Sequence, residues 1–363
     1  MSLLSDALKA RFAALDVHTA IHRHKQLSMT DELEHLSRSI RQADGRDTYG
    51  KGGAISEFED QLCELFGKPD GLFLPTGTLA QCAAVKCYSE SSGRNEIGLH
   101  PTSHLLIHEH MAIEHLWGLK AIEVGNLEDV LTAGDLSQLN PEKTAAIIVE
   151  TPMREIGGVL PSWDELTEMR AWCDEYGVKM HLDGARLWQA EPYYERSLSD
   201  IAALFDSLYI SFYKDLGGIF GAALLGTSEL IEQARVWARR AGGNPITLYP
   251  EVIAARSGLD KYLPQMPRLV DYAKQLAAAL DLPDVDIIPE QPQVAMFHLR
   301  FRINAETLVQ KVTSYAEKTG ILVLPLPRAG DTHSCVCEIS VGDQACAQLP
   351  SFWAEHLEAC LHT

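Results

Sequence analysis

Short apolar runs alternate with amphipathic segments through the middle of the chain. Four of these runs have the length of a buried strand, and they cover residues 145–150, 178–183, 208–212 and 220–226. Between the first two, the segment SWDE at 162–165 has the pattern of a capping box, which predicts a helix that ends at Gly177. Because buried strands that alternate with helices form parallel or mixed sheets covered on both faces, we predict an α/β domain.

The first 80 residues add helices and one short strand. Residues 1–50 have mostly helical patterns, and residues 54–66 repeat apolar side chains at helical spacing. Residues 71–74 predict a short buried strand that leads into a turn at 75–78 and then into another helix. We expect this turn to bind a phosphate, because a helix that starts after a tight glycine turn presents backbone N–H groups to an anion.

The pattern changes near residue 265. Here it predicts a helix over 270–280, strands over 294–301, 321–327 and 334–340, and a closing helix over 352–361. These elements indicate a smaller α+β domain. We therefore expect an N-terminal helical arm, a large α/β domain and a small C-terminal domain, over residues 1–45, 46–265 and 266–363.

Composition narrows the class of protein. A chain of 363 residues with 46% hydrophobic and 22% charged side chains fits a soluble globular protein. The formal charge of −19 provides no basic excess, so we expect no nucleic-acid partner. No run of about 18 uncharged apolar residues predicts a membrane span. The eight cysteines lack paired CxxC motifs, so we expect no metal site and reduced thiols in the cytoplasm.

Two strand ends carry side chains that suit one cofactor. Asp183 closes the run at 178–183, and Lys214 follows the run at 208–212, with Gly217 and Gly218 close behind it. Pyridoxal phosphate needs a lysine for its Schiff base and an acid that keeps its ring nitrogen protonated. Since ligands of such sheets bind at the carboxyl ends of the strands, this pair predicts a pyridoxal-phosphate enzyme.

Several longer strings match a known family. The chain resembles the threonine aldolase and β-eliminating lyase family of fold-type I pyridoxal-phosphate enzymes. The most specific string is HLDGAR at 181–186, and the likeness also covers residues 47–53, 65–81 and 150–161 and the segments around His104 and Lys214. It implies the transferase-like fold of that class, a large domain with a mostly parallel sheet covered by helices and a small C-terminal α+β domain.

The resemblance implies catalytic roles for three residues. Lys214 would hold the cofactor as a Schiff base and later act as a base. Asp183 would hold the proton on the ring nitrogen, and His181, two residues earlier on the same strand face, is a plausible supporting residue. His104 would stack on the ring and assist deprotonation of the substrate hydroxyl.

Binding roles follow from the same likeness. Thr76, Gly77 and Thr78 match the phosphate-binding turn. Arg186 matches an arginine near the cofactor and the substrate carboxylate, where a planar guanidinium can bind two oxygens. Tyr49 matches a residue on a loop near the active site.

Some substrate-side positions depart from the family pattern. A serine expected near the N-terminus is replaced within residues 24–27, which read HKQL, and an expected C-terminal arginine falls at Glu338. Arg186 is then the one recognisable partner of the substrate carboxylate. Arg154 or Arg328 could serve as a further anchor, as could the pair Arg300 and Arg302.

Three hypotheses follow for function. The first is a carbon–carbon lyase that cleaves a β-hydroxy-α-amino acid to glycine and an aldehyde. The second keeps the cofactor but performs β-elimination or another reaction on an atypical amino acid. The third is a non-enzymatic binding protein on the same scaffold. The resemblance also implies a small amino-acid substrate and a symmetric homodimer or homotetramer.

Overall fold

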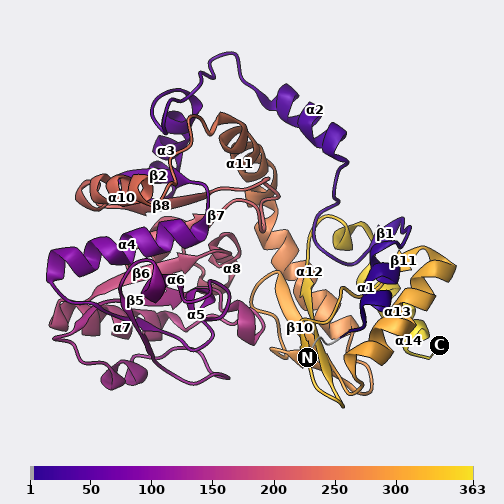
Figure 1. The fold of residues 1–363 in the computed structure, drawn as a ribbon. Helices are drawn as coiled ribbons and strands as arrows, with labels where there is room; N and C mark the ends of the chain where they lie inside the picture. The colour runs from indigo at the N-terminus through magenta and orange to yellow at the C-terminus, as the bar shows by residue number, and fades with distance from the viewer. Residues whose placement is uncertain (1–3, 363) are drawn as a thin grey trace. The chain divides into compact units, whose positions relative to one another are not determined.

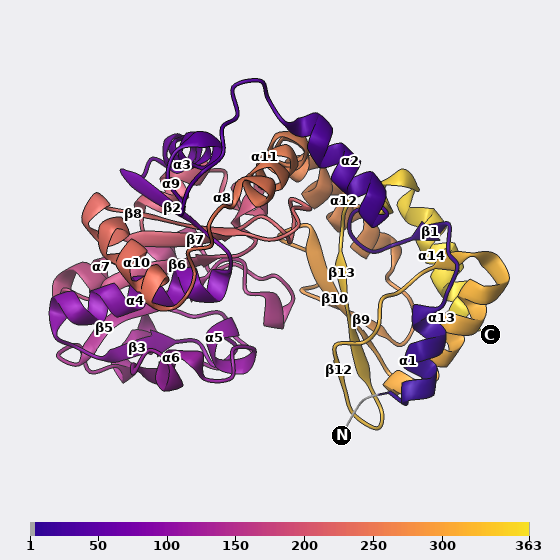
Figure 2. The ribbon, with the colours of Figure 1, turned by 45° about the horizontal axis from the view of Figure 1, so that its top comes forward.

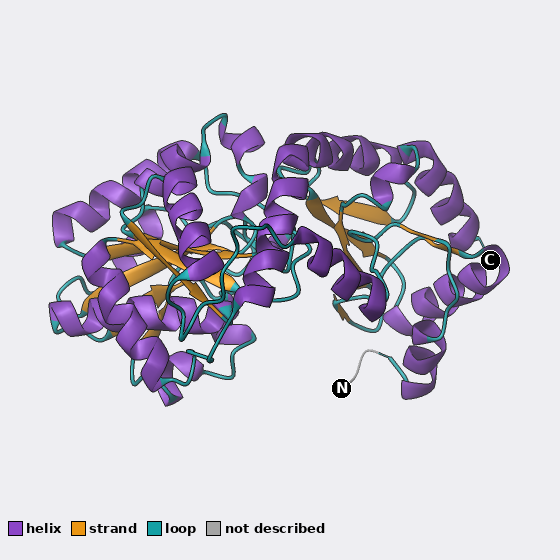
Figure 3. Ribbon diagram, turned by 90° about the horizontal axis from the view of Figure 1, so that it is seen from above, coloured by secondary structure: helices purple, strands orange, loops and turns teal. Residues whose placement is uncertain are grey.

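The computed structural model describes residues 4–362, and the chain forms two compact units. The larger unit contains residues 27–153 and 160–264. The smaller unit contains residues 4–26, 154–159 and 265–362. Figures 1 and 3 show a sheet with helices in each of them. We propose that the chain divides into folding domains at the predicted boundaries, residues 45 and 265.

The larger unit is built on a seven-stranded sheet with the order β2-β8-β7-β6-β5-β3-β4. The strands are β2 (Asp70–Leu74), β3 (Glu96–Leu99), β4 (Lys120–Glu123), β5 (Thr144–Glu150), β6 (Lys179–Gly184), β7 (Ser207–Ser211) and β8 (Ala222–Gly226). Strands β3 to β7 pair in parallel, whereas β8 is antiparallel to both β7 and β2. The mostly parallel sheet predicted from the apolar runs is confirmed. The short strands β3 and β4 were not expected.

Helices cover both faces of this sheet, and α4 and α7 lie on opposite faces in Figure 1. The helices of this unit are α2 (Met29–Ser39), α3 (Gly53–Phe66), α4 (Gly77–Ser92), α5 (His104–Ile107), α6 (Ala112–His115), α7 (Trp163–Tyr176), α8 (Glu191–Tyr194), α9 (Leu198–Ala203), α10 (Ser228–Arg240) and α11 (Tyr249–Tyr262). The expectation of mostly helical structure over residues 1–50 is wrong, because the described part of that segment is helical in α2 and in one eight-residue helix of the smaller unit.

Helix α7 begins and ends as predicted, but one half of its predicted capping box is missing. Gly177 follows it in the left-handed conformation with φ of 61°, as is common after a helix end. At the start, Ser162 Oγ accepts the backbone N–H of Glu165 at 3.1 Å. The carboxylate of Glu165 accepts the N–H of Ala133 at 2.9 Å, so the second half of the predicted capping box is replaced by a tertiary hydrogen bond.

The smaller unit contains an antiparallel sheet with the order β12-β13-β10-β9. Its strands are β9 (Val285–Ile288), β10 (Met296–Phe301), β12 (Ala329–Gly330) and β13 (Cys335–Ser340), and helices α12 (Met266–Ala279), α13 (Ala305–Thr319) and α14 (Pro350–Leu361) pack around it. The predicted strand over 321–327 is shortened to β11 (Ile321–Leu322), because two prolines follow at 325 and 327 and cannot donate to a ladder.

The N-terminal segment 4–26 belongs to this smaller unit. Helix α1 (Asp6–Ala13) packs against α13, and strand β1 (Thr19–Ala20) pairs in parallel with β11. Within residues 4–362, none of the helices is both long enough and apolar enough to cross a membrane.

Candidate active site

Asp183 and Lys214 lie at the carboxyl edge of the parallel strands. In the register of the sheet, Glu150 on β5 pairs with Asp183 on β6, and Asp183 pairs with Tyr209 on β7. Lys214 follows three residues after the last residue of β7. Because these strands are parallel, the ends of β5, β6 and β7 deliver Glu150, Asp183 and Lys214 to the same edge.

Charged groups around Lys214 set the protonation of its amine. Burial, together with the Arg186 guanidinium, lowers the pKa of Lys214 to about 8, although Asp183, Glu150 and Asp215 act in the opposite direction. The side chain is nevertheless partly exposed, so other molecules can reach it. A lysine whose pKa lies near 8 has a sizeable neutral fraction close to neutral pH, and the neutral amine is the form that attacks a carbonyl carbon.

Asp183 is held rigidly within its strand. Its side chain is buried, and Oδ1 accepts the N–H of Ala185 at 3.1 Å. The next residue is glycine for a steric reason, because a Cβ at Gly184 would lie 2.6 Å from the carbonyl oxygen of Tyr209. The tight approach of β6 to β7 thus explains the Asp-Gly pair in the HLDGAR string.

Arg186 follows Asp183 on the same connection and is also buried. Its Nε lies 3.9 Å from Oδ1 of Asp215. Arg186 therefore belongs to the charged cluster around Lys214, and its role near the cofactor stays a prediction from the resemblance.

The predicted phosphate turn lies between β2 and α4. Thr76 precedes the first residue of α4, and its hydroxyl accepts the N–H of Leu79 at 3.2 Å. Gly77 begins the helix. A Cβ at Gly77 would lie only 2.2 Å from the phenol oxygen of Tyr209, so packing requires glycine there. The turn and the N-terminus of a 16-residue helix together form the arrangement that binds anions.

Tyr209 is a site residue that the sequence analysis did not identify. It lies on β7 opposite Asp183, and its phenol contacts the first residue of α4. Burial raises its pKa well above the ordinary value, and Tyr213 and Asp183 add to the effect, so the phenol remains protonated. Its place in the site follows from its register opposite Asp183, and the sequence does not show how β6 and β7 pair.

His104 is oriented by an acid five residues later. Its Nδ1 lies 2.9 Å from Oε1 of Glu109. Hydrogen bonds from His104 and from the Thr78 hydroxyl lower the pKa of Glu109, although burial opposes them. The ring of His108 lies 4.8 Å from that of His104, tilted by 47°. With Nδ1 bound to a carboxylate, Nε2 is the atom through which His104 would exchange a proton.

Two other predicted residues have different surroundings. Tyr49 is 52% exposed, has a left-handed φ of 53°, and its ring lies 5.8 Å from the guanidinium carbon of Arg239. Its role near the substrate therefore rests on the resemblance alone. His181 is fully buried and its Nδ1 lies 2.7 Å from Ser207 Oγ, which also accepts the Tyr88 hydroxyl at 2.7 Å. The hydrogen bond of His181 thus goes to Ser207, and its supporting role beside Asp183 stays a prediction.

Glu338, at the position of the expected arginine, binds arginines in the smaller unit. Its Oε2 accepts Arg154 Nε at 2.7 Å and lies 3.4 Å from Arg328 Nη1. Arg328 also pairs with Glu155. Arg302 instead lies near two acids at 284 and 286, and Arg300 is exposed. Of the anchors considered from the sequence, Arg154 and Arg328 are the ones beside Glu338.

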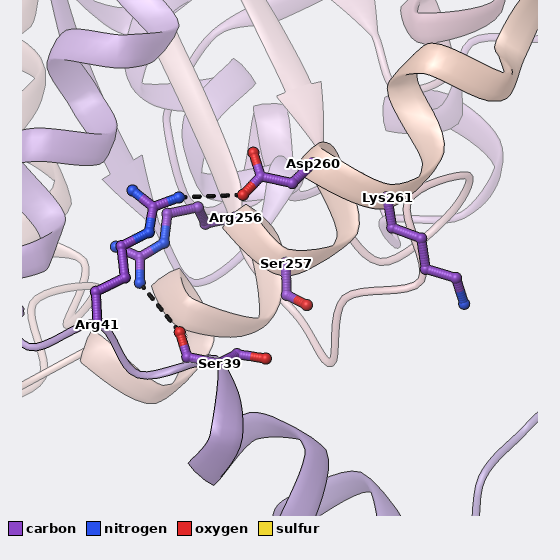
Figure 4. Close-up of a pocket in the computed structure, with 6 residues that line it drawn as sticks. All are labelled: Ser39, Arg41, Arg256, Ser257, Asp260 and Lys261. Atoms are coloured by element: carbon purple, nitrogen blue, oxygen red, sulfur yellow. Dashed lines mark hydrogen bonds and ion pairs between the residues drawn. The ribbon is translucent and has the colours of Figure 1, made fainter.

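A pocket of about 350 Å³ lies elsewhere in the larger unit and is lined by Ser39, Arg41, Arg256, Ser257, Asp260 and Lys261 (Figure 4). Arg41 Nη2 lies 3.1 Å from Asp260 Oδ2, and Arg256 donates to Asp44 at 2.6 and 2.7 Å. Its two arginines are bound by acids of the same chain, and none of the predicted site residues lines it.

The chain is similar in sequence and fold to threonine aldolases. The β-eliminating lyase family matches residues 30–302. Low-specificity L-threonine aldolase 1 of Arabidopsis thaliana is 24% identical over 77% of this chain and 80% of its own length. Aldolase vrtJ of Penicillium aethiopicum is 32% identical over 54% of this chain, and the match spans only 52% of vrtJ.

A solved structure from Listeria monocytogenes, provisionally assigned as an L-allo-threonine aldolase, is 33% identical and superposes with a TM-score of 0.91, covering 98% of each chain. These similarities agree with the mostly parallel sheet and with the position of Asp183 and Lys214 at the ends of its strands. The chain belongs to the β-eliminating lyase family and has the fold of fold-type I pyridoxal-phosphate enzymes.

Proposed function

We propose that this protein is a pyridoxal-phosphate-dependent carbon–carbon lyase. It cleaves a β-hydroxy-α-amino acid of the threonine type to glycine and an aldehyde. The observation that carries the proposal is the cluster at one sheet edge, where Asp183 and Arg186 both act on Lys214 and its pKa is near 8. The family match and the similarity to threonine aldolases support the same activity.

The residues present fit the cofactor. Lys214 Nζ would hold its carbonyl carbon, and the buried Asp183 carboxylate would hold a proton on its ring nitrogen. The turn at Thr76–Thr78 and the N-terminus of α4 would bind its phosphate. When bound, pyridoxal phosphate supplies a ring that withdraws the electrons released from the substrate's α-carbon.

The side chains of this protein would divide the remaining tasks. His104 Nε2 would take the proton from the β-hydroxyl group of the substrate, with Glu109 stabilising the charge on the imidazole through Nδ1. The Arg186 guanidinium would bind the substrate carboxylate. Lys214 would carry protons to and from the α-carbon because its amine is not fully protonated near neutral pH.

A product assay tests the proposal against β-elimination. Purified protein with pyridoxal phosphate is incubated with threonine, allo-threonine and phenylserine, and both aldehyde and ammonia are measured. Aldehyde and glycine in equal amounts support aldol cleavage, and the K214A variant serves as the inactive control. Ammonia without glycine would show β-elimination instead. Absence of any turnover and of any covalent cofactor adduct would favour the binding-protein hypothesis.

We further propose that the enzyme acts in the cytoplasm as a symmetric homodimer or homotetramer. Helix α2 supports the assembly, since none of its residues is buried in the single chain and Met29 and Leu33 are 84% and 64% exposed. Exposed apolar side chains on an amphipathic helix fit a contact with a second copy. Light scattering of the purified protein, with an L33D variant alongside, tests this, and a monomeric wild-type protein would contradict it.

A further inference from the structure

Strand β2 lies at an edge of the large sheet and pairs there with β8 alone among residues 4–362. Its outer edge is nonetheless covered, by helices α3 and α10 (Figures 1 and 2). Leu72 and Phe73 on this strand are buried. Backbone N–H and C=O groups in such a position need partners from the protein, because water cannot reach them freely.

Two charged side chains provide those partners. Oε1 of Glu59, on α3, accepts the N–H of Phe73 at 2.7 Å. Nη2 of Arg235, on α10, donates to the carbonyl oxygen of Gly71 at 2.9 Å and to Oε2 of Glu59 at 3.2 Å. The two residues thus bind a donor and an acceptor two positions apart, as one residue of a neighbouring parallel strand would.

The Glu59 carboxylate is deeply enclosed. It is 7% exposed, and burial raises its pKa to about 7 even though Arg235 and the Phe73 N–H act to lower it. The Asp70 carboxylate adds to the rise. The carboxylate is therefore a costly group to bury, and its contacts with Arg235 and the strand offset that cost.

This pair stands next to two segments assigned to the site. Phe73 is three residues before Thr76, and the chain between them is the end of β2 and Pro75. Arg235 Nη1 also lies 3.5 Å from the carbonyl oxygen of Gly50, the residue after Tyr49. Arg235 thus contacts both the loop that carries Tyr49 and the strand that leads into the phosphate turn, whereas Glu59 contacts that strand and Arg235.

We propose that Glu59 and Arg235 are positioning residues for the phosphate-binding turn. By fixing the outer edge of β2, they hold Thr76, Gly77 and the N-terminus of α4 in their binding geometry before the cofactor arrives. The inference rests on the proposed function, because the turn is assigned there to the phosphate of pyridoxal phosphate. Preorganisation of this kind strengthens binding by removing the cost of ordering the turn.

The test compares four substitutions in the full-length protein. E59L removes both the acceptor and the charge, E59Q keeps an acceptor for the Phe73 N–H, and R235M removes the donor to Gly71. E96Q is the matched control, since Glu96 on β3 forms a 2.9 Å ion pair with Lys120 on β4, the opposite edge strand of the same sheet. Affinity of the apo-protein for pyridoxal phosphate is measured by fluorescence titration, and hydrogen exchange of residues 71–80 is measured without cofactor.

We expect E59L and R235M to weaken cofactor binding about ten- to a hundredfold, with faster exchange over residues 71–80, since a charged hydrogen bond is lost. E59Q is expected to recover much of the affinity and E96Q to resemble the wild type. Unchanged affinity and exchange in E59L and R235M would overturn the inference, as would equally faster exchange throughout the larger unit. If the wild-type protein binds no pyridoxal phosphate, the proposed function itself fails, which is a distinct result.

Discussion

Nδ1 of His104 lies 2.9 Å from Oε1 of Glu109, and the same carboxylate is hydrogen bonded by the hydroxyl of Thr78. One partly buried acid therefore connects the candidate proton acceptor to the first turn of α4, where the phosphate turn lies. Because Nδ1 of His104 faces Glu109, Nε2 is the ring nitrogen that points away from this carboxylate. Glu109 also links His104 to Thr78 of the phosphate turn.

Glu109 is expected to matter for catalysis without touching the substrate. E109A should lower kcat/KM for threonine about tenfold or more, because the imidazole loses the charged hydrogen-bond partner that orients it. Steady-state kinetics on the loaded enzyme measure this. E114A in the same segment is the control, since Glu114 accepts the N–H of Ala121 instead. Equal kinetics for E109A and the wild type would contradict the role.

Attachment of the cofactor should depend on pH through Lys214. Its pKa is lowered from 10.5 to about 8, so the neutral amine increases as pH rises through 8 and dominates above it. The rate at which apo-protein forms a borohydride-reducible adduct with pyridoxal phosphate should rise from pH 7 to 9 and then level off. R186A should move the midpoint upward, because Arg186 helps to lower the pKa. A midpoint near 10.5 in the wild type would refute the assignment.

Asp183 should be required in its charged form. D183N can still accept the N–H of Ala185, so the fold should survive, but it cannot stabilise a protonated ring nitrogen. Turnover is expected to fall about a hundredfold or more, since the electron-withdrawing power of the ring depends on that proton. Steady-state kinetics measure the turnover of D183N, and circular dichroism shows whether its fold survives. Near-normal turnover in D183N would mean that another group performs this task.

Glu338 should contribute to the stability of the smaller unit. It is buried and pairs with Arg154 and Arg328, so E338A removes one of the carboxylates around these arginines and should lower the free energy of unfolding by about 1–3 kcal/mol. E317A is the control, because Glu317 pairs with Arg11 at the surface and its loss should change little. Urea unfolding measures the free energy of unfolding of E338A, E317A and the wild-type protein. Similar small effects would show that the Glu338 cluster is not important for folding.

His181 should make the protein sensitive to mild acid. Burial lowers its pKa from 6.5 to about 3, so the unfolded chain binds a proton that the folded chain excludes between these values. Stability is therefore lost as pH falls from about 6.5, by up to about 1.4 kcal/mol per pH unit from this residue. H181N should show a shallower decline in urea unfolding between pH 7 and 5. An equally steep decline would assign the effect to other groups.

The sequence alone determined the local parts of this protein. The strands that deliver Asp183 and Lys214, the turn at Thr76–Thr78 and helix α7 were predictable, because apolar runs, glycines and capping residues act within a few positions of themselves. The resemblance to a family then indicated which of these side chains belong to one site. The helical content of residues 1–50 was overestimated, and so was the strand at 321–327, which two prolines shorten.

The tertiary structure decided which distant groups meet. Tyr209 faces Gly77, Glu109 binds both His104 and Thr78, and Arg235 reaches Glu59 across 176 positions of sequence. Glu165, in the first turn of α7, likewise accepts the N–H of Ala133 instead of a backbone N–H of its own helix. These pairings follow from strand register and from how helices pack on the sheet. No local pattern encodes them, because each depends on the free energy of the whole packed unit.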